Sequence, residues 1–250
     1  MVLLHGLTAS ADLNWFGAFD GLAGAGFRVL SVEHRGYAGG PPLARERGRF
    51  RCRLEDLADD VVAVADALGV ERLVAVGYSV GGAVAQLLWH RHRERVSGLV
   101  LGATASVFSD SVRERVLSAL LPTASGAARV VPAVAGRFVG STLRARFHGS
   151  PWAGWADAEL ARHRPAVMLA WAATLARFSS RAWIGEVDVP TAVVVTSRDV
   201  LVPTSRQRAL AAAIPGAHVV PLEGDHGVFV TDQAAFSAAM VEACRLVTAG

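Results

Sequence analysis

The chain has 250 residues, of which 52% are hydrophobic and 19% charged, with a formal net charge of +3. This composition excludes an intrinsically disordered protein, and the length is enough to build one sizeable hydrophobic core. The net charge is too small to argue for a nucleic-acid partner. Because no apolar stretch reaches the roughly 18 uncharged residues of a membrane-spanning helix, no transmembrane segment is expected.

The start of the chain and its cysteines indicate a cytoplasmic protein. Residues 1–6 have neither the basic region nor the long apolar region of a secretory signal. Cys52 and Cys244 lie near opposite ends of the chain, a spacing that gives no disulfide framework and no metal site. We therefore expect a cytoplasmic location and no bound metal.

Short apolar runs alternate with amphipathic stretches in the first 103 residues. In chain order we predict a strand at 2–4, a strand at 27–33, a helix at 54–68, a strand at 73–77, a helix at 80–92 and a strand at 99–101. Near-continuous apolar strands that alternate with helices are typical of a parallel sheet with helices on both faces. The fold class is therefore α/β.

The same alternation returns near the end of the chain. We predict a strand at 192–196, a helix at about 204–213, a strand at 218–222 and a last helix at about 232–247. The segment 104–182 between the two halves contains helical stretches interrupted by Gly and Pro, and no convincing strand. We therefore predict one α/β core, made of 1–103 and 183–250, with a helical insertion at 104–182.

The sequence Gly77-Tyr78-Ser79-Val80-Gly81 joins a predicted strand to a predicted helix. This is the setting of a nucleophile elbow, in which a serine occupies a sharp turn and glycines remove side chains that would collide there. The first N–H groups of the helix have no partner within it, so the Val80 N–H is available to a developing oxyanion. A serine N-cap on an ordinary turn is the alternative interpretation.

Two further residues match this serine. Asp199 follows the strand at 192–196, and His226 lies in the Gly224-Asp225-His226-Gly227 loop after the strand at 218–222. The chain order Ser, Asp, His is that of the catalytic triad on a parallel α/β sheet. Asp225 is a neighbouring carboxylate, and we expect it to structure the loop.

These pieces, with His5-Gly6 after the first strand and Arg35-Gly36 after the second, make the chain resemble the α/β-hydrolase superfamily over nearly its whole length. It is most similar to the esterase and lactonase-like branch that carries a helical cap. The resemblance implies that the Leu7 N–H completes an oxyanion hole with Val80, that 104–182 is the cap, and that no cofactor is needed. His5 is expected to shape the oxyanion turn.

The implied chemistry is acyl transfer. His226 takes the proton of Ser79 as it attacks a carbonyl, and Asp199 stabilises the imidazolium. We expect a small-molecule ester, lactone or thioester substrate. An acyltransferase, C–C hydrolase or perhydrolase using the same triad stays open, as does a ligand-binding or receptor-like protein on the same fold. Epoxide hydrolases and haloalkane dehalogenases are disfavoured, because they use an Asp where Ser79 stands.

The sequence departs from the family at two places. Relatives usually carry a β-hairpin before the His-Gly strand, whereas this sequence begins inside that strand, so the hairpin strands are missing or the natural N-terminus lies upstream of Met1. Relatives also commonly have an Asp in the position of Glu33, and we expect little catalytic consequence from this change.

The predicted cap is basic and aromatic. Residues 105–182 hold ten Arg against four acidic residues, a net charge of +6. Their large aromatics are Phe138, Phe147, Trp152, Trp155, Trp171 and Phe178. This pattern suggests a lipid-like or anionic substrate, with core packing as the alternative explanation of the aromatics. The oligomeric state is not predicted.

Overall fold

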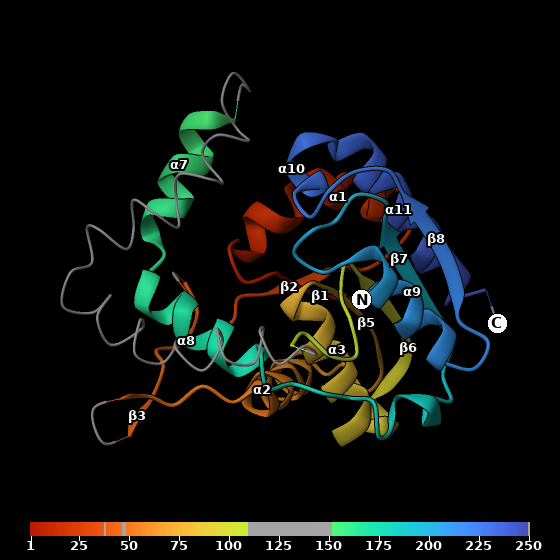
Figure 1. Cartoon of the computed structure of the whole chain (residues 1–250), viewed down its shortest axis with the longest axis horizontal. Helices are drawn as coiled ribbons and strands as arrows, with labels where there is room; N and C mark the ends of the chain where they lie inside the picture. The colour runs from red at the N-terminus through yellow and green to blue at the C-terminus, as the bar shows by residue number, and fades with distance from the viewer. Residues whose placement is uncertain (38, 47–48, 110–151, 250) are drawn as a thin grey trace.

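The computed structural model describes residues 1–37, 39–46, 49–109 and 152–249 (Figure 1). Six parallel strands form one sheet in the order β2-β1-β5-β6-β7-β8. The strands are β1 (Val2–Leu4), β2 (Leu30–Val32), β5 (Leu73–Tyr78), β6 (Val96–Gly102), β7 (Thr191–Thr196) and β8 (His218–Leu222). This arrangement confirms the predicted α/β architecture.

Helices cover both faces of the sheet (Figure 1). One face packs against α2 (Leu54–Ala67), α3 (Val80–Arg91) and α9 (Thr204–Ala213), and the other against α1 (Ala11–Gly24) and α11 (Gln233–Leu246). Short helices η1 (Arg93–Arg95), η2 (Ile184–Glu186) and α10 (Val228–Thr231) complete the core. Successive strand residues alternate between the faces: Val2 and Leu4 join one hydrophobic cluster, and Leu3 joins the other.

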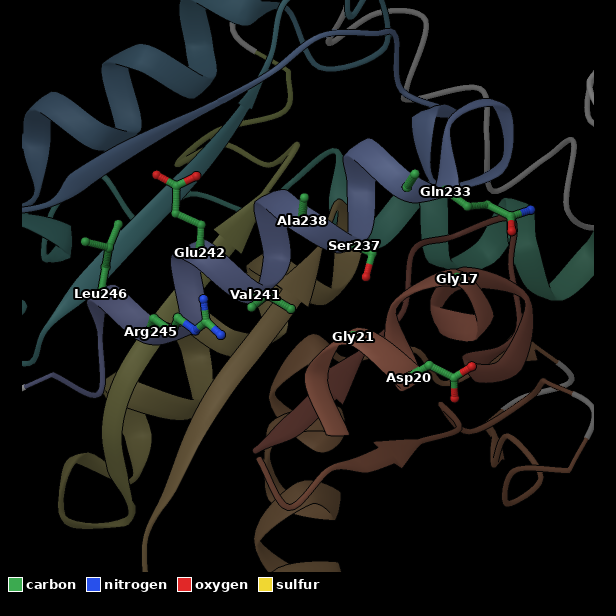
Figure 2. A pocket seen from close by; sticks show the side chains of 11 residues that line it. Gly17, Asp20, Gly21, Gln233, Ser237, Ala238, Val241, Glu242, Arg245 and Leu246 are labelled. Carbon is green, nitrogen blue, oxygen red and sulfur yellow. The ribbon is translucent and has the colours of Figure 1, made fainter. Parts of the chain in front are cut away.

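The helix α1 was not predicted from the sequence. Its N-cap Ser10 accepts a hydrogen bond from the Leu13 N–H, but Gly17 and Gly21 are poor helix formers. Their use lies in the packing, because a Cβ at Gly21 would collide with the Ser237 hydroxyl of α11. Figure 2 shows Gly21 and Ser237 on the facing sides of α1 and α11. Both residues also line a groove of about 940 Å³ between these helices, and none of the predicted catalytic side chains lines it.

A second difference concerns the arginine-rich stretch 45–53, which the sequence gives no reason to call a strand. The structure has a small antiparallel pair there, β3 (Arg45–Glu46) with β4 (Arg49–Phe50). Strands of two residues are too short to produce a periodic pattern, so hydrophobic periodicity cannot reveal them.

The described part of the predicted cap contains two helices. They are α7 (Ala153–Arg162) and α8 (Pro165–Leu175), which lie to one side of the sheet (Figure 1). A β-bridge between Val107 and Ser179 places the two ends of the segment 104–182 side by side. Phe138 and Phe147 lie outside the described residues. Within the described ranges, no helix combines the length and apolar character needed to cross a membrane.

Candidate active site

Ser79 lies on a tight turn between β5 and α3, with φ 55° and ψ −114°. Non-glycine residues rarely adopt such positive φ values, and they do so where the surroundings enforce the conformation. Here the Ser79 N–H donates to the Gly102 carbonyl at 2.9 Å, and the Thr104 hydroxyl donates to the Ser79 carbonyl at 2.8 Å. A Cβ at Gly77 would collide with the Gly81 carbonyl, so the turn requires glycine there. Ser79 is therefore held in a sharp strand-to-helix turn by contacts on both sides of its peptide.

The structure brings the three predicted triad residues together. His226 Nε2 lies 2.9 Å from Ser79 Oγ, and His226 Nδ1 lies 2.7 Å from Asp199 Oδ2. Ser79 follows β5, Asp199 follows β7 and His226 follows β8, so all three lie at the carboxyl edge of the parallel sheet. The result is one continuous hydrogen-bonded chain from a carboxylate through an imidazole to a hydroxyl. Such a chain can move a proton away from an attacking oxygen.

Asp199 is held by donors on both of its oxygens. Burial by itself would raise its pKa, but the hydrogen bond and the charge of His226, with further donors, outweigh burial and lower the pKa. The further donors are Leu201 N–H and Val202 N–H, each 2.9 Å from Oδ1, and Thr196 Oγ1 and Gln207 Nε2, at 3.0 Å and 3.2 Å from Oδ2. The carboxylate therefore stays ionised and fixed in orientation beside His226.

The neighbouring carboxylate has a different partner. Asp225 Oδ1 accepts a hydrogen bond from the Gly227 N–H at 2.8 Å, within its own loop. The His226 main-chain carbonyl accepts a hydrogen bond from the Tyr78 hydroxyl at 3.0 Å. Tyr78, the residue before Ser79, thus holds the loop that carries His226. The two residues are 148 positions apart in the sequence, so the sequence does not reveal this contact.

The turn after β1 adjoins Ser79. A Cβ at Gly6 would lie 3.5 Å from Ser79 Cβ, and a Cβ at Gly81 would collide with the Leu4 carbonyl. The end of β1 is therefore packed against the start of α3. Leu7 and Val80, the predicted oxyanion donors, lie on the two segments that flank Ser79 in this way.

Sequence reasoning missed Asn14 and Tyr37, which contact the same turn. The Gly6 N–H donates to Asn14 Oδ1 at 2.9 Å, and the Tyr37 hydroxyl donates to the Leu7 carbonyl at 2.5 Å. Both side chains are buried. For Asn14, the one sequence signal of a buried polar role is its position between the apolar residues Leu13 and Trp15. This signal can be interpreted only once α1 is recognised as a helix.

The cap aromatics divide into two groups. Trp171 and Phe178 belong to the hydrophobic core, where Trp171 is 1% exposed. Trp152 and Trp155 instead lie against Phe16 of α1, with ring centroids 5.8 Å and 5.0 Å away. Core packing therefore explains Trp171 and Phe178, and Trp155 also packs against the hydrophobic cluster on the α1 and α11 side, whereas Trp152 is 47% exposed. That these aromatics line a substrate pocket stays a prediction.

Three buried histidines, His5, His34 and His163, cluster around Tyr37 next to the turn after β1. The His5 ring centroid is 4.0 Å from that of His34 and 4.8 Å from that of Tyr37, which in turn is 5.3 Å from that of His163. Burial lowers the pKa of His5 to about 3, against the opposing effect of its hydrogen bond with the Gly6 carbonyl. Burial likewise lowers the pKa of His34 and of His163. All three side chains are neutral in the folded protein at neutral pH.

This cluster predicts a loss of stability in acid. Unfolded histidines take up protons below their ordinary pKa of 6.5, while folded His5 does so only near 3. The stability is therefore present above pH 6.5 and is lost as the pH falls toward the folded pKa, with a slope of at most about 1.4 kcal/mol per pH unit for one histidine. Urea unfolding of wild type and His163→Gln between about pH 7 and pH 5 should give a shallower slope for the variant.

The matched control is His218→Gln. His218 is exposed on β8, outside the cluster of buried rings, and its replacement should leave the slope of wild type unchanged. Equal slopes for wild type and His163→Gln would contradict the prediction.

Comparison with known proteins extends these observations to the whole chain. The family model described as alpha/beta hydrolase fold matches residues 1–233. The protein named Putative carbamate hydrolase RutD of Variovorax paradoxus is 30% identical, covering 100% of this chain and 92% of that protein. Epoxide hydrolase B of Mycobacterium tuberculosis is 36% identical over 100 residues, which are 40% of this chain and only 27% of that protein.

A solved structure gives the same fold. The thermophilic esterase of Thermogutta terrifontis superposes with a TM-score of 0.82 at 22% identity, covering 98% of this chain and 89% of that one. Since the family model and RutD both extend over most of the sequence, the chain belongs to the alpha/beta hydrolase fold family and is a hydrolase of that fold.

Proposed function

We propose that the chain is a serine hydrolase that cleaves a carboxylic ester, or a related acyl compound, through an acyl-enzyme on Ser79. The observation that carries this proposal is the continuous contact from Asp199 through His226 to the Ser79 hydroxyl, at 2.7 Å and 2.9 Å. A serine on a sharp turn, with its hydroxyl oxygen 2.9 Å from the Nε2 of a histidine that a carboxylate orients, is arranged for nucleophilic attack.

The proposed reaction has two halves. In the first, Ser79 Oγ attacks the substrate carbonyl carbon and its proton passes to His226 Nε2, while Asp199 stabilises the imidazolium. The Leu7 and Val80 N–H groups bind the tetrahedral oxyanion, and each such donor lowers the barrier by roughly 3–4 kcal/mol in comparable sites. The alcohol leaves with the proton held by His226. In the second half, water attacks the acyl-Ser79 by the same route and releases the acid.

The substrate is proposed to carry an acyl carbonyl. The relatives support this, because the Thermogutta protein is named an esterase and RutD a carbamate hydrolase, and esters and carbamates share that carbonyl. Epoxide opening is the less favoured chemistry, since the epoxide hydrolases of this fold carry an Asp in the position of Ser79. The partial coverage of epoxide hydrolase B also gives its activity little weight here.

A substrate panel tests the proposal. Wild type and Ser79→Ala are assayed with esters of short to long chain, anionic and neutral at equal length, and with lactones, thioesters, carbamates and an epoxide. We expect hydrolysis of at least one acyl class by wild type, none by Ser79→Ala, and no epoxide opening. Acyl hydrolysis that persists in Ser79→Ala, or turnover of the epoxide alone, would contradict the proposed chemistry.

A further inference from the structure

We propose that His5, Asn14 and Tyr37 are positioning residues, which together fix the direction in which the Leu7 N–H points. This inference rests on the proposed function, because it concerns the donor that the proposed oxyanion hole requires. The three side chains come from the end of β1, from α1 and from the segment after β2, and all three meet the turn 5–7.

The contact of His5 with Gly6 sets the orientation of one peptide group. His5 Nδ1 lies 2.8 Å from the Gly6 carbonyl oxygen, and the His5 side chain is fully buried. In a planar trans peptide the carbonyl oxygen and the following N–H point in opposite directions. When the Gly6 carbonyl is drawn toward the His5 ring, the Leu7 N–H must therefore point away from that ring.

The hydrogen bonds also assign the protonation of His5. A carbonyl oxygen only accepts, so Nδ1 carries the proton that goes to Gly6. On the other side of the ring, Nε2 accepts a hydrogen bond from the His34 N–H at 3.1 Å. Glu33 Oε1 lies 2.9 Å from the same Nε2, next to the His34 N–H. The ring is thus held from both sides.

Asn14 and Tyr37 hold the backbone groups on each side of that peptide. The Gly6 N–H donates to Asn14 Oδ1 at 2.9 Å, and the Leu7 carbonyl accepts from the Tyr37 hydroxyl at 2.5 Å. The turn can therefore rotate only if one of three buried hydrogen bonds breaks. Such preorganised donors stabilise developing charge without reorganising during the reaction.

The test compares two substitutions of His5 that place an amide N–H at different depths. The amide nitrogen of Asn is as many bonds from Cα as Nδ1, whereas that of Gln corresponds to Nε2. His5→Gln is therefore expected to lower kcat about 10²- to 10³-fold with little change in KM, as for loss of one oxyanion donor. His5→Asn should recover most of that loss, because it keeps a donor to the Gly6 carbonyl.

Tyr37→Phe provides a milder variant, since it removes only the hydroxyl and keeps the ring. Its kcat is expected to fall about 3- to 10-fold, the effect of one hydrogen bond, again with KM unchanged. The control is His90→Gln, which makes the same kind of change at an exposed histidine that stacks on Trp183 and lies at the far end of α3. It should leave kcat unchanged.

The outcomes separate this inference from the proposed function. Ester hydrolysis by wild type that is fully kept in His5→Gln and Tyr37→Phe would overturn the inference alone. The inference would also be overturned if the variants raised KM and left kcat unchanged. It would likewise be overturned if His5→Asn lost as much kcat as His5→Gln while Tyr37→Phe kept the kcat of wild type. If wild type shows no hydrolysis that depends on Ser79, the proposed function fails, and the inference fails with it.

Discussion

Single substitutions of Ser79 or His226 by Ala are each expected to lower kcat by about 10⁶-fold, and the double substitution to lower it hardly further. The reason is that neither side chain acts without the other. Without the 2.9 Å contact to His226, the serine hydroxyl keeps its proton, and without the hydroxyl, the imidazole has nothing to activate. Steady-state kinetics on the best substrate of the panel measures the two single variants and the double variant.

Asp199 and Asp225 provide a matched pair of substitutions, because Asp199 contacts the imidazole of His226, whereas Asp225 contacts the Gly227 N–H. Asp199→Asn should lower kcat about 10⁴-fold, because the amide favours the wrong imidazole tautomer. Asp225→Asn keeps an acceptor for the Gly227 N–H and should retain nearly all of the activity. Effects of Ser79→Ala and His226→Ala that multiply in the double variant, or a larger loss from Asp225→Asn than from Asp199→Asn, would show that these residues do not work as one chain.

Gly81→Ala is expected to destabilise the fold by more than about 4 kcal/mol, the range reached when buried backbone must shift. The new Cβ would lie 2.5 Å from the Leu4 carbonyl carbon, and it would collide with the carbonyl oxygen itself. That carbonyl belongs to β1, which pairs with both β2 and β5, so it cannot move without disturbing the sheet. Urea and thermal unfolding of the purified variant measure the loss.

Gly24→Ala is the control for the glycine substitution. It lies at the last position of α1, and a Cβ there meets no atom within 4 Å. Alanine forms helix better than glycine by about 1 kcal/mol, so this variant should be as stable as wild type or slightly more stable. An unfolding midpoint of Gly81→Ala equal to that of wild type would mean that α3 does not approach β1 as closely as the structure has it.

The parts of the fold that the sequence predicts are those with a local signature. The strand before Ser79 and the helix after it are adjacent in the chain, and glycines mark the turn between them. Asp199 and His226 are far from Ser79 in sequence, but each follows an apolar strand, and parallel strands bring their carboxyl ends to one edge. The triad geometry could therefore be anticipated from element order together with the family resemblance.

The parts that could not be predicted depend on contacts between distant segments. Helix α1 contains two glycines, which allow α11 to pack closely against it. Because glycine is a poor helix former, local propensity alone argues against a helix there. Asn14 and Tyr37 contact the backbone of the turn after β1, and nothing in their own sequence neighbourhood marks that role. Side-chain to backbone contacts of this kind have no periodic pattern.

Covalent labelling tests whether Ser79 is a reactive nucleophile. Folded wild type is incubated with a fluorophosphonate probe, and the modified residue is located by peptide mass spectrometry. We predict one adduct, on Ser79, that is absent from Ser79→Ala and from unfolded wild type. A folded wild-type protein that acquires no adduct would contradict a reactive Ser79 and favour a ligand-binding protein on this fold. An adduct that persists in Ser79→Ala would mean that another residue is the nucleophile.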